Sequence, residues 1–168
     1  EGDYIAYSSN NTRQGFHVLA DKLIEVFDLD SDLQVYDIRN NCLITAASVK
    51  DRNVWETFPA FSADGKTLYF CAATPRPIPA ETDQIRYNLC SVDFDPATGT
   101  IGSRIDTLVF AEGMGKSVSF PKPSYDGRFL VYTLSDYGNF SIWHHEADLW
   151  IMDLATGESR PMSLANSG

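Results

Sequence analysis

The sequence contains FPAFSADGKTLYF at residues 58–70 and, 62 residues later, FPKPSYDGRFLVY at residues 120–132. A phenylalanine, a proline, a serine, an Asp-Gly pair, a basic residue, a leucine and a final aromatic residue recur at matching positions. Asp-Gly between two short apolar and aromatic runs is a strong hairpin signal, because Gly tolerates positive φ and Asp bonds its own following backbone. The phrase therefore predicts a strand–turn–strand unit that is present twice.

Each copy continues into a second phrase, in which a leucine is followed four residues later by an aspartate and then by a Thr-Gly turn. This second phrase spans Leu89–Gly99 in one copy and Leu149–Gly157 in the other. The start of the chain fits a partial third copy, with Gly2 at the glycine position and Leu33–Asp37 as the second phrase. Two phrases per copy predict four antiparallel strands, joined as strand a, turn, strand b, long loop, strand c, turn and strand d.

The β-branched and aromatic runs beside these turns have the length of strands. We expect strands a to d at 57–62, 67–73, 87–94 and 104–110 in one complete copy, and at 118–124, 129–134, 147–154 and 158–163 in the next. The partial copy lacks strand a, and its other strands are expected at 3–9, 33–38 and 42–48. Proline in the two a strands cannot donate to a ladder, so we expect weaker pairing there.

A repeated four-stranded unit is typical of a β-propeller. The phrases F-P-x-x-S-x-D-G-[KR]-x-L-x-[FY] and L-[WC]-x-x-D, with a following T-G, resemble the TolB-like propeller repeats, which are relatives of the WD-type blade. We therefore expect an all-β fold, a partial β-propeller of four-stranded antiparallel blades. Its one segment, 1–168, divides into a partial blade at 1–54 and blades at 55–116 and 117–168. The resemblance also implies a periplasmic or otherwise exported protein.

A closed propeller needs about four to eight blades, and this sequence supplies fewer than three. We expect further blades of a larger parent chain to complete the ring, because the sequence opens at Glu1-Gly2, directly on an a–b turn. The alternative is a second copy of this chain that closes the ring. An open array would leave a bare blade face and unpaired strand edges, and both favour association.

The composition argues against several classes of partner and cofactor. Thirteen basic and 23 acidic side chains give a net charge of −10, and such a surface repels nucleic-acid phosphates. The sequence has no apolar run of about 18 residues, so no membrane span is expected. None of the three cysteines lies in a C-x-x-C pair, so zinc ribbons, thioredoxin motifs and c-type haem attachment are unsupported. Cys71 and Cys90 lie in apolar stretches and are expected in the core.

The b–c connections are the long ones, at 10–32, 74–86 and 135–146. Antiparallel geometry puts them on one face, and insertions confined to one face of a repeat array often mark its binding face. The alternative is that they are tolerated extensions, since lengthening a surface loop costs little. Arginines there suit a carboxylate or phosphate, and aromatic residues suit peptides or sugars. The candidate ligand-binding residues are Arg13, His17, Arg76, Tyr137, Trp143 and His144.

Two motifs resemble nucleotide and calcium sites without completing them. Gly113–Ser117 lacks the earlier glycine of a P-loop, since position 110 is Phe, and we expect it to be a d–a connection. Asp28–Asp32 has the carboxylate spacing of a calcium loop, but Leu33 and Arg39 occupy the positions of its glycine and glutamate. Turn-forming, solvated aspartates are the better interpretation.

His144 and His145 stand beside each other, and neighbouring residues of a strand point to opposite faces. We therefore expect no metal site, although His17 belongs to the same face and a site shared between blades is conceivable. No cofactor is expected. The sequence also lacks the G-x-S-x-G nucleophile elbow of serine hydrolases, so we expect no catalytic residue in this chain.

The favoured function is a non-catalytic recognition or scaffold propeller that binds a protein or peptide through its long-loop face. The alternative is the propeller domain of a larger enzyme, such as a prolyl-peptidase-type hydrolase, whose catalytic domain lies elsewhere. Propellers that resemble these repeats also accompany such hydrolases. A carbohydrate-binding propeller that uses the aromatic loop at 137–144 is a weaker alternative.

Overall fold

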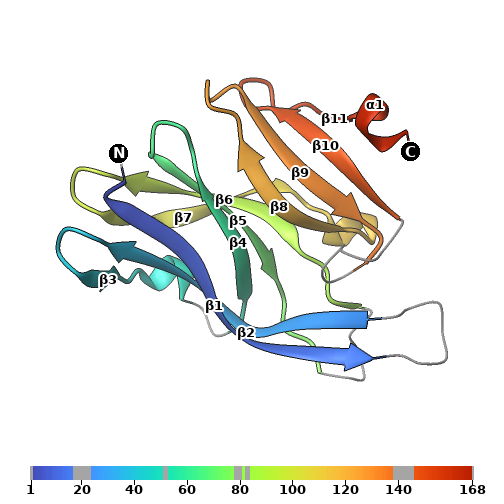
Figure 1. The fold of residues 1–168 in the computed structure, drawn as a ribbon, viewed down its shortest axis with the longest axis horizontal. Helices are drawn as coiled ribbons and strands as arrows, with labels where there is room; N and C mark the ends of the chain where they lie inside the picture. The colour runs from blue at the N-terminus through green and yellow to red at the C-terminus, as the bar shows by residue number, and fades with distance from the viewer. Residues whose placement is uncertain are drawn as a thin grey trace.

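The computed structural model describes residues 2–16, 24–50, 53–77, 81, 84–137 and 146–167. These residues form three antiparallel sheets that follow one another along the chain and pack side by side (Figure 1). Blade 1 has the strand order β1-β2-β3, blade 2 the order β4-β5-β6-β7, and blade 3 the order β11-β10-β9-β8. The predicted all-β partial propeller is confirmed.

The strands are β1 (Tyr4–Phe16), β2 (Ile24–Asp37), β3 (Cys42–Ile44), β4 (Trp55–Phe61), β5 (Thr67–Ala73), β6 (Asn88–Asp95), β7 (Thr100–Val109), β8 (Ser117–Pro123), β9 (Phe129–Ser135), β10 (Ala147–Asp153) and β11 (Ser159–Pro161). Short helical turns follow each blade: η1 (Ala47–Val49), η3 (Glu112–Met114) and α1 (Ser163–Asn166). The part of the chain that the structure describes has no helix long and apolar enough to cross a membrane.

Blade 1 differs most from the sequence-based expectation. Its strands b and c continue to Phe16 and begin again at Ile24, so most of the segment 10–32 is a long hairpin and not a loop. The ladder pairs Arg13 with Phe27, far beyond the predicted strand ends. The reason is composition, because β-branched and aromatic residues recur along both arms. A shift of register after Ser9 interrupts the ladder.

The serine and the aspartate of the repeated phrase hold the a–b turn together. In blade 2 the Ser62 hydroxyl donates to Asp64 Oδ1 at 2.7 Å, and the Lys66 N–H donates to the same oxygen at 3.0 Å. Ser62 Oγ also accepts from the Thr67 N–H at 2.9 Å. Gly65 has a φ of +70°, a left-handed conformation that favours glycine. Blade 3 makes the same three bonds, at 2.6, 3.1 and 2.9 Å, among Ser124, Asp126, Arg128 and Phe129.

Relative to the repeat alignment, the c–d turn begins two residues later in blade 2 than in blade 3. In blade 3, Asp153 pairs with Phe129 and also begins the turn, where its carboxylate accepts from the Ala155 N–H at 2.9 Å. Blade 2 divides these roles: Asp93 takes the pairing position, and Asp95 begins the turn. Strand c of blade 2 is therefore longer, although the sequence phrases align.

Strand a of each complete blade is interrupted at its Phe-Pro pair. The β4–β5 ladder skips Phe58 and Pro59, and the β8–β9 ladder skips Phe120 and Pro121. Both phenylalanines have a φ of +53°, which is unusual for a residue with a Cβ. Their rings contact each other across the two blades, with centroids 4.4 Å apart. The weaker pairing predicted at the prolines is confirmed at Pro59 and Pro121, whereas Pro123, for which it was also predicted, stays in the ladder opposite Leu130.

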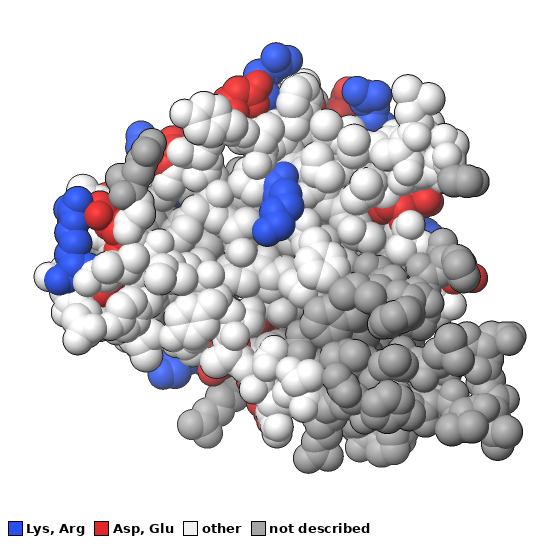
Figure 2. Space-filling model, viewed as in Figure 1, with Lys and Arg blue, Asp and Glu red and all other residues white. Residues whose placement is uncertain are grey.

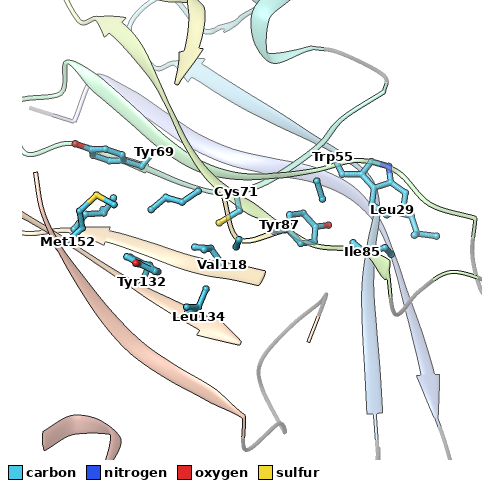
Figure 3. Close-up of a cluster of buried hydrophobic side chains, with 14 residues drawn as sticks. Leu29, Trp55, Tyr69, Cys71, Ile85, Tyr87, Val118, Tyr132, Leu134 and Met152 are labelled. Carbon is cyan, nitrogen blue, oxygen red and sulfur yellow. The ribbon is translucent and has the colours of Figure 1, made fainter. Parts of the chain in front are cut away.

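Two buried clusters fill the spaces between the blades. The cluster between blades 1 and 2 includes Leu33, Val35, Leu68, Phe70, Cys90 and Val92. The cluster between blades 2 and 3 includes Tyr69, Cys71, Leu89, Val118, Leu130, Tyr132 and Met152 (Figure 3). Cys71 and Cys90 are core residues, as expected. Burial raises the pKa of the Cys71 thiol well above its usual value and that of Cys90 to about 11, so both stay protonated.

Candidate functional site

The two rims of this propeller segment differ in their connections. The rim with the a–b and c–d turns is called the short-turn face below, and the rim with the b–c and d–a connections is called the long-loop face. In Figure 1 the β1–β2 hairpin projects at the lower right, while the short turns lie along the upper and left edges. The antiparallel strand order of each blade therefore places the short turns on one rim and the b–c and d–a connections on the other, as expected.

Ion pairs and a side-chain hydrogen bond join the b–c and d–a connections on the long-loop face. Arg76, in the b–c connection of blade 2, lies 3.7 Å from the Glu112 carboxylate in the d–a connection, and both side chains are about one-third exposed. Lys116 pairs with Asp136 at the start of the next b–c connection. The Arg86 guanidinium donates to the carbonyl of residue 115 at 3.0 Å. Arg76 thus has an acidic partner in the chain itself.

Tyr137 stands where the third b–c connection leaves blade 3. A hydrogen bond to Glu146, followed by burial, raises the pKa of the Tyr137 phenol. The Ser135 hydroxyl donates to the Tyr137 carbonyl at 3.1 Å, and the Asp136 N–H donates to the Glu146 carbonyl at 3.1 Å. The two ends of this connection are therefore closed on each other, with the half-buried Tyr137 ring held at its base.

The structure does not describe the side chains of the other four predicted site residues. The backbone of Arg13 lies in β1, opposite Phe27, but its side chain lies outside the described part of the structure. His17, Trp143 and His144 also lie outside the described residues. A binding site formed by these residues with Arg76 and Tyr137 stays a prediction.

Glu56 is a buried acidic residue that the sequence-based prediction missed. It lies in β4 and is only 1% exposed, and its carboxylate accepts from the Leu33 N–H of β2 at 3.3 Å. Two residues earlier in β2, the Ser31 hydroxyl is buried without a hydrogen-bond partner in the described structure. Asp30 beside it has a φ of +52°. The sequence could have revealed this residue as a charged side chain at a core-facing position of β4. In the structure, Glu56 joins the inner strand of blade 2 to blade 1.

The short-turn face carries a pocket at each junction between blades. A pocket of 320 Å³ lies between blades 1 and 2, beside Asp3 and Tyr4. A larger one, of 560 Å³, lies between blades 2 and 3, beside Asp64, Tyr69 and Asp126. The sequence-based prediction missed both, because the Asp-Gly phrase was assigned to the scaffold alone.

The charged side chains lie mostly at the edges of the molecule in the view of Figure 2, where the turns and connections are, and few lie across its middle. No group of three or more His, Cys, Asp or Glu side chains could hold a metal ion among the residues placed by the structure.

Comparison with known proteins identifies the fold. No family model and no curated protein matches the chain. The chain is similar to a solved structure of puromycin hydrolase, at 15% identity and a TM-score of 0.53, over 95% of this chain and 21% of that one. It is also similar to a prolyl endopeptidase, at 13% identity and a TM-score of 0.52, over 89% of this chain and 22% of that one.

The chain spans about a fifth of the length of these two structures. At such low identity the likeness concerns the fold alone, because one fold hosts many functions. It supports the partial propeller and does not single out the TolB-like family, so that resemblance stays a prediction.

Proposed function

We propose that residues 1–168 are part of the propeller domain of a larger hydrolase. In this proposal the domain admits and orients a peptide-like substrate, and the catalytic domain lies elsewhere in the protein. The observation that carries the proposal is the likeness of nearly the whole chain to about a fifth of two hydrolases, puromycin hydrolase and a prolyl endopeptidase.

The outer faces of blades 1 and 3 support a larger ring. Ile5 and Leu43 are 50% and 49% exposed in blade 1, whose opposite face packs Val35 against blade 2. In blade 3, Leu149 is 39% exposed, whereas Met152 packs against blade 2. In blade 2 both faces are covered by neighbours, so we propose that further blades cover these two exposed faces.

The chain is proposed to contribute no catalytic residue, since its sequence has no G-x-S-x-G elbow. In the prolyl endopeptidases, inter-domain dynamics has a role in catalysis and specificity. A propeller beside a catalytic domain would contribute by controlling access, and the long-loop face, with Arg76 and Tyr137, is the surface proposed for that contact. Export, which the TolB-like resemblance implies, belongs to the same proposal and is checked by cell fractionation.

The full-length protein tests the proposal directly. We expect it to hydrolyse chromogenic peptide or aminoacyl amides and to react with a fluorophosphonate at a serine outside residues 1–168. Replacing that serine by alanine is the control and should abolish both signals. A full-length protein made of further blades only, with no hydrolysis and no labelling, would overturn the proposal and favour the recognition or scaffold propeller.

Two variants test the role of the long-loop face. Arg76→Gln and Tyr137→Phe should each raise KM for peptide amides several-fold, while fluorophosphonate labelling stays unchanged, because neither residue would touch the reacting bond. Asp95→Asn, on the short-turn face, is the matched control and should leave KM unchanged. An equal effect of all three changes would show that the long-loop face has no special part in substrate entry.

A further inference from the structure

The larger pocket on the short-turn face is built from both copies of the repeated turn. It has a volume of 560 Å³ and is called the turn pocket below. Residues 62–64 of blade 2 form one wall, and residues 125–127 of blade 3 form the other. Tyr69, Pro123 and Leu154 also line it.

Each wall presents an aspartate carboxylate. One of its oxygens accepts hydrogen bonds within the turn, and the other accepts none from the described residues. Oδ1 of Asp64 and Oδ1 of Asp126 each accept two bonds within their own turns. Oδ2 of either residue bonds to no neighbouring residue in the described structure, and no described lysine or arginine forms an ion pair with them. The serine hydroxyl, and then the backbone N–H, lowers the pKa of each aspartate, so both are ionised at neutral pH.

The Tyr69 hydroxyl is a third available group in the turn pocket. The side chain is 94% buried, since Tyr69 is only 6% exposed, and its ring packs in the cluster between blades 2 and 3. Figure 3 shows the hydroxyl at the edge of this cluster, pointing away from most of the other side chains. No described residue hydrogen-bonds to it, and it is not among the buried polar atoms that lack a partner, so the hydroxyl is open to solvent or a ligand on the pocket side. The position of Tyr69 corresponds to Val131 in blade 3, so this hydroxyl is not part of the repeated scaffold.

The smaller pocket, between blades 1 and 2, provides an internal comparison. There Asp3 forms an ion pair with Arg39 at 2.8 Å, and the Tyr4 hydroxyl donates to the Pro96 carbonyl at 3.1 Å. Asp3 and Tyr4, the polar residues that blade 1 contributes to the smaller pocket, thus have partners within the chain, whereas Asp64 lines both pockets. The turn pocket differs in adding Asp126 and Tyr69, which form no ion pair or side-chain hydrogen bond with another blade among the described residues.

We propose that the turn pocket binds the guanidinium group of an arginine-like ligand, either a small molecule or an arginine side chain of a peptide. A planar guanidinium has five N–H donors, enough to bond two carboxylates and a hydroxyl together. Pro123 and Leu154 offer apolar surface to its alkyl stem. Tyr125, which is 95% exposed, supplies an aromatic face for stacking at the rim. The site goes beyond the proposed function and does not require a hydrolase domain.

Calorimetric titration of the full-length protein tests the charge requirement. The probe is N-acetyl-L-arginine amide, and its matched control is N-acetyl-L-citrulline amide, which has the same shape and no charge. We expect the arginine compound to bind at least about tenfold more tightly, because charge-assisted hydrogen bonds to carboxylates are lost in the control. Equal affinity for the two probes, or no binding of either at millimolar concentration, would overturn the proposal.

A second titration identifies the source of the group. A capped peptide with one central arginine among serines and alanines is compared with the arginine amide and with the same peptide containing citrulline. Tighter binding of the arginine peptide supports a peptide ligand, and tighter binding of the amide supports a small molecule. Discrimination against citrulline is required in both cases.

Three substitutions test the location. Asp64→Asn and Asp126→Asn retain an oxygen for the turn and remove the charge, so each should weaken binding about tenfold. Tyr69→Phe removes a hydroxyl that no described residue uses, and should weaken binding about three- to tenfold with unchanged thermal stability. Asp95→Asn, at a turn outside the pocket, is the control and should bind as the unaltered protein does.

Unchanged affinity in the three pocket variants would place the ligand elsewhere and overturn the proposal. If the aspartate variants fail to fold, as judged by circular dichroism, Tyr69→Phe decides alone, because the change leaves the turns intact. A Tyr69→Phe protein that is folded and binds the arginine amide as tightly as the unaltered protein would also contradict the site.

Discussion

The a–b turns of blades 2 and 3 are alike bond for bond, whereas the described parts of the b–c connections of blades 1 and 2 differ. The serine-to-aspartate hydrogen bond measures 2.7 Å in one turn and 2.6 Å in the other, and the glycines have φ of +70° and +71°. Blade 1, by contrast, continues as a long hairpin, and blade 2 continues through residues held by the Arg76–Glu112 ion pair. A local bonding pattern specifies the turns, while the stacking of blades leaves the connections free to differ.

The largest expected effect tests whether the two complete blades are equivalent in their cores. Leu68 and Leu130 occupy matching positions of the repeat, and both are fully buried, one in each cluster between blades. Leu68→Ala and Leu130→Ala should each lower the free energy of unfolding by about 2–5 kcal/mol, measured by urea denaturation. Leu149→Ala, at a 39% exposed position, is the control with a much smaller loss. A large cost in only one blade would show that their equivalence ends at the turns.

The next effect tests the left-handed glycines of the two turns. A Cβ at Gly65 or Gly127 would meet no atom within 4 Å, so any cost comes from the backbone conformation and not from a clash. Gly65→Ala and Gly127→Ala should each cost about 1–2 kcal/mol in urea denaturation. Gly→Asn at the same positions is the matched control and should cost less, because Asn tolerates this conformation better. Costs that differ between the two turns would contradict their equivalence.

A smaller effect concerns the serine of each turn. Ser62 and Ser124 each donate one hydrogen bond and accept another within their turn. Ser62→Ala and Ser124→Ala should each lower the free energy of unfolding by about 1 kcal/mol at pH 7. Ser→Thr, which retains the hydroxyl, serves as the control.

The same serine variants should also change the response to acid. The folded-state pKa values of Asp64 and Asp126 are lowered, first by the serine hydroxyls. Their contribution to stability is therefore present above the unfolded pKa of about 3.9 and is lost as the pH falls through the lower, folded values. Removing the serine raises the folded pKa, so the difference between variant and unaltered protein should shrink between pH 5 and pH 2. A difference that does not depend on pH would show that the serine does not act through the aspartate.

The smallest effect is expected on the long-loop face. The Arg76–Glu112 pair is 3.7 Å long and about one-third exposed at both ends, so Arg76→Gln should cost less than about 1 kcal/mol. The cost should vanish in 1 M salt, where exposed charges are screened. Urea denaturation at low and high salt measures this, and Arg104→Gln, at another exposed pair, is the control. A cost comparable to that of the glycine variants would mean that the connections are as constrained as the turns.

The fold was predictable from sequence because its signals are local. The Asp-Gly pair, its serine and the following strand residues lie within a few positions of one another, so the hairpins and their repetition could be read directly. The length of the blade 1 hairpin was not predicted, because the same residue types are compatible with a long surface loop. The later start of the c–d turn in blade 2, at Asp95, was also not predicted. The repeat alignment matches Asp93 correctly and gives no sign of the two additional residues.

The candidate sites were only partly predictable. The sequence placed Arg76 and Tyr137 in b–c connections, and the structure shows where both lie, but their internal partners Glu112 and Glu146 were not foreseen. The turn pocket was missed for a different reason. It exists because two turns that are distant in sequence approach each other above Tyr69, and neither turn alone contains that information.

The contact between Phe58 and Phe120 has a consequence for how such an array can grow. Each phenylalanine has a strained positive φ, and the two rings rest on each other across the junction of blades 2 and 3. A blade inserted between them would separate the two rings, and a unit with its own phenylalanine at this position would replace the one contact by two. Lengthening of the array between these two blades would therefore keep the ring contacts when the added unit carries its own Phe-Pro pair.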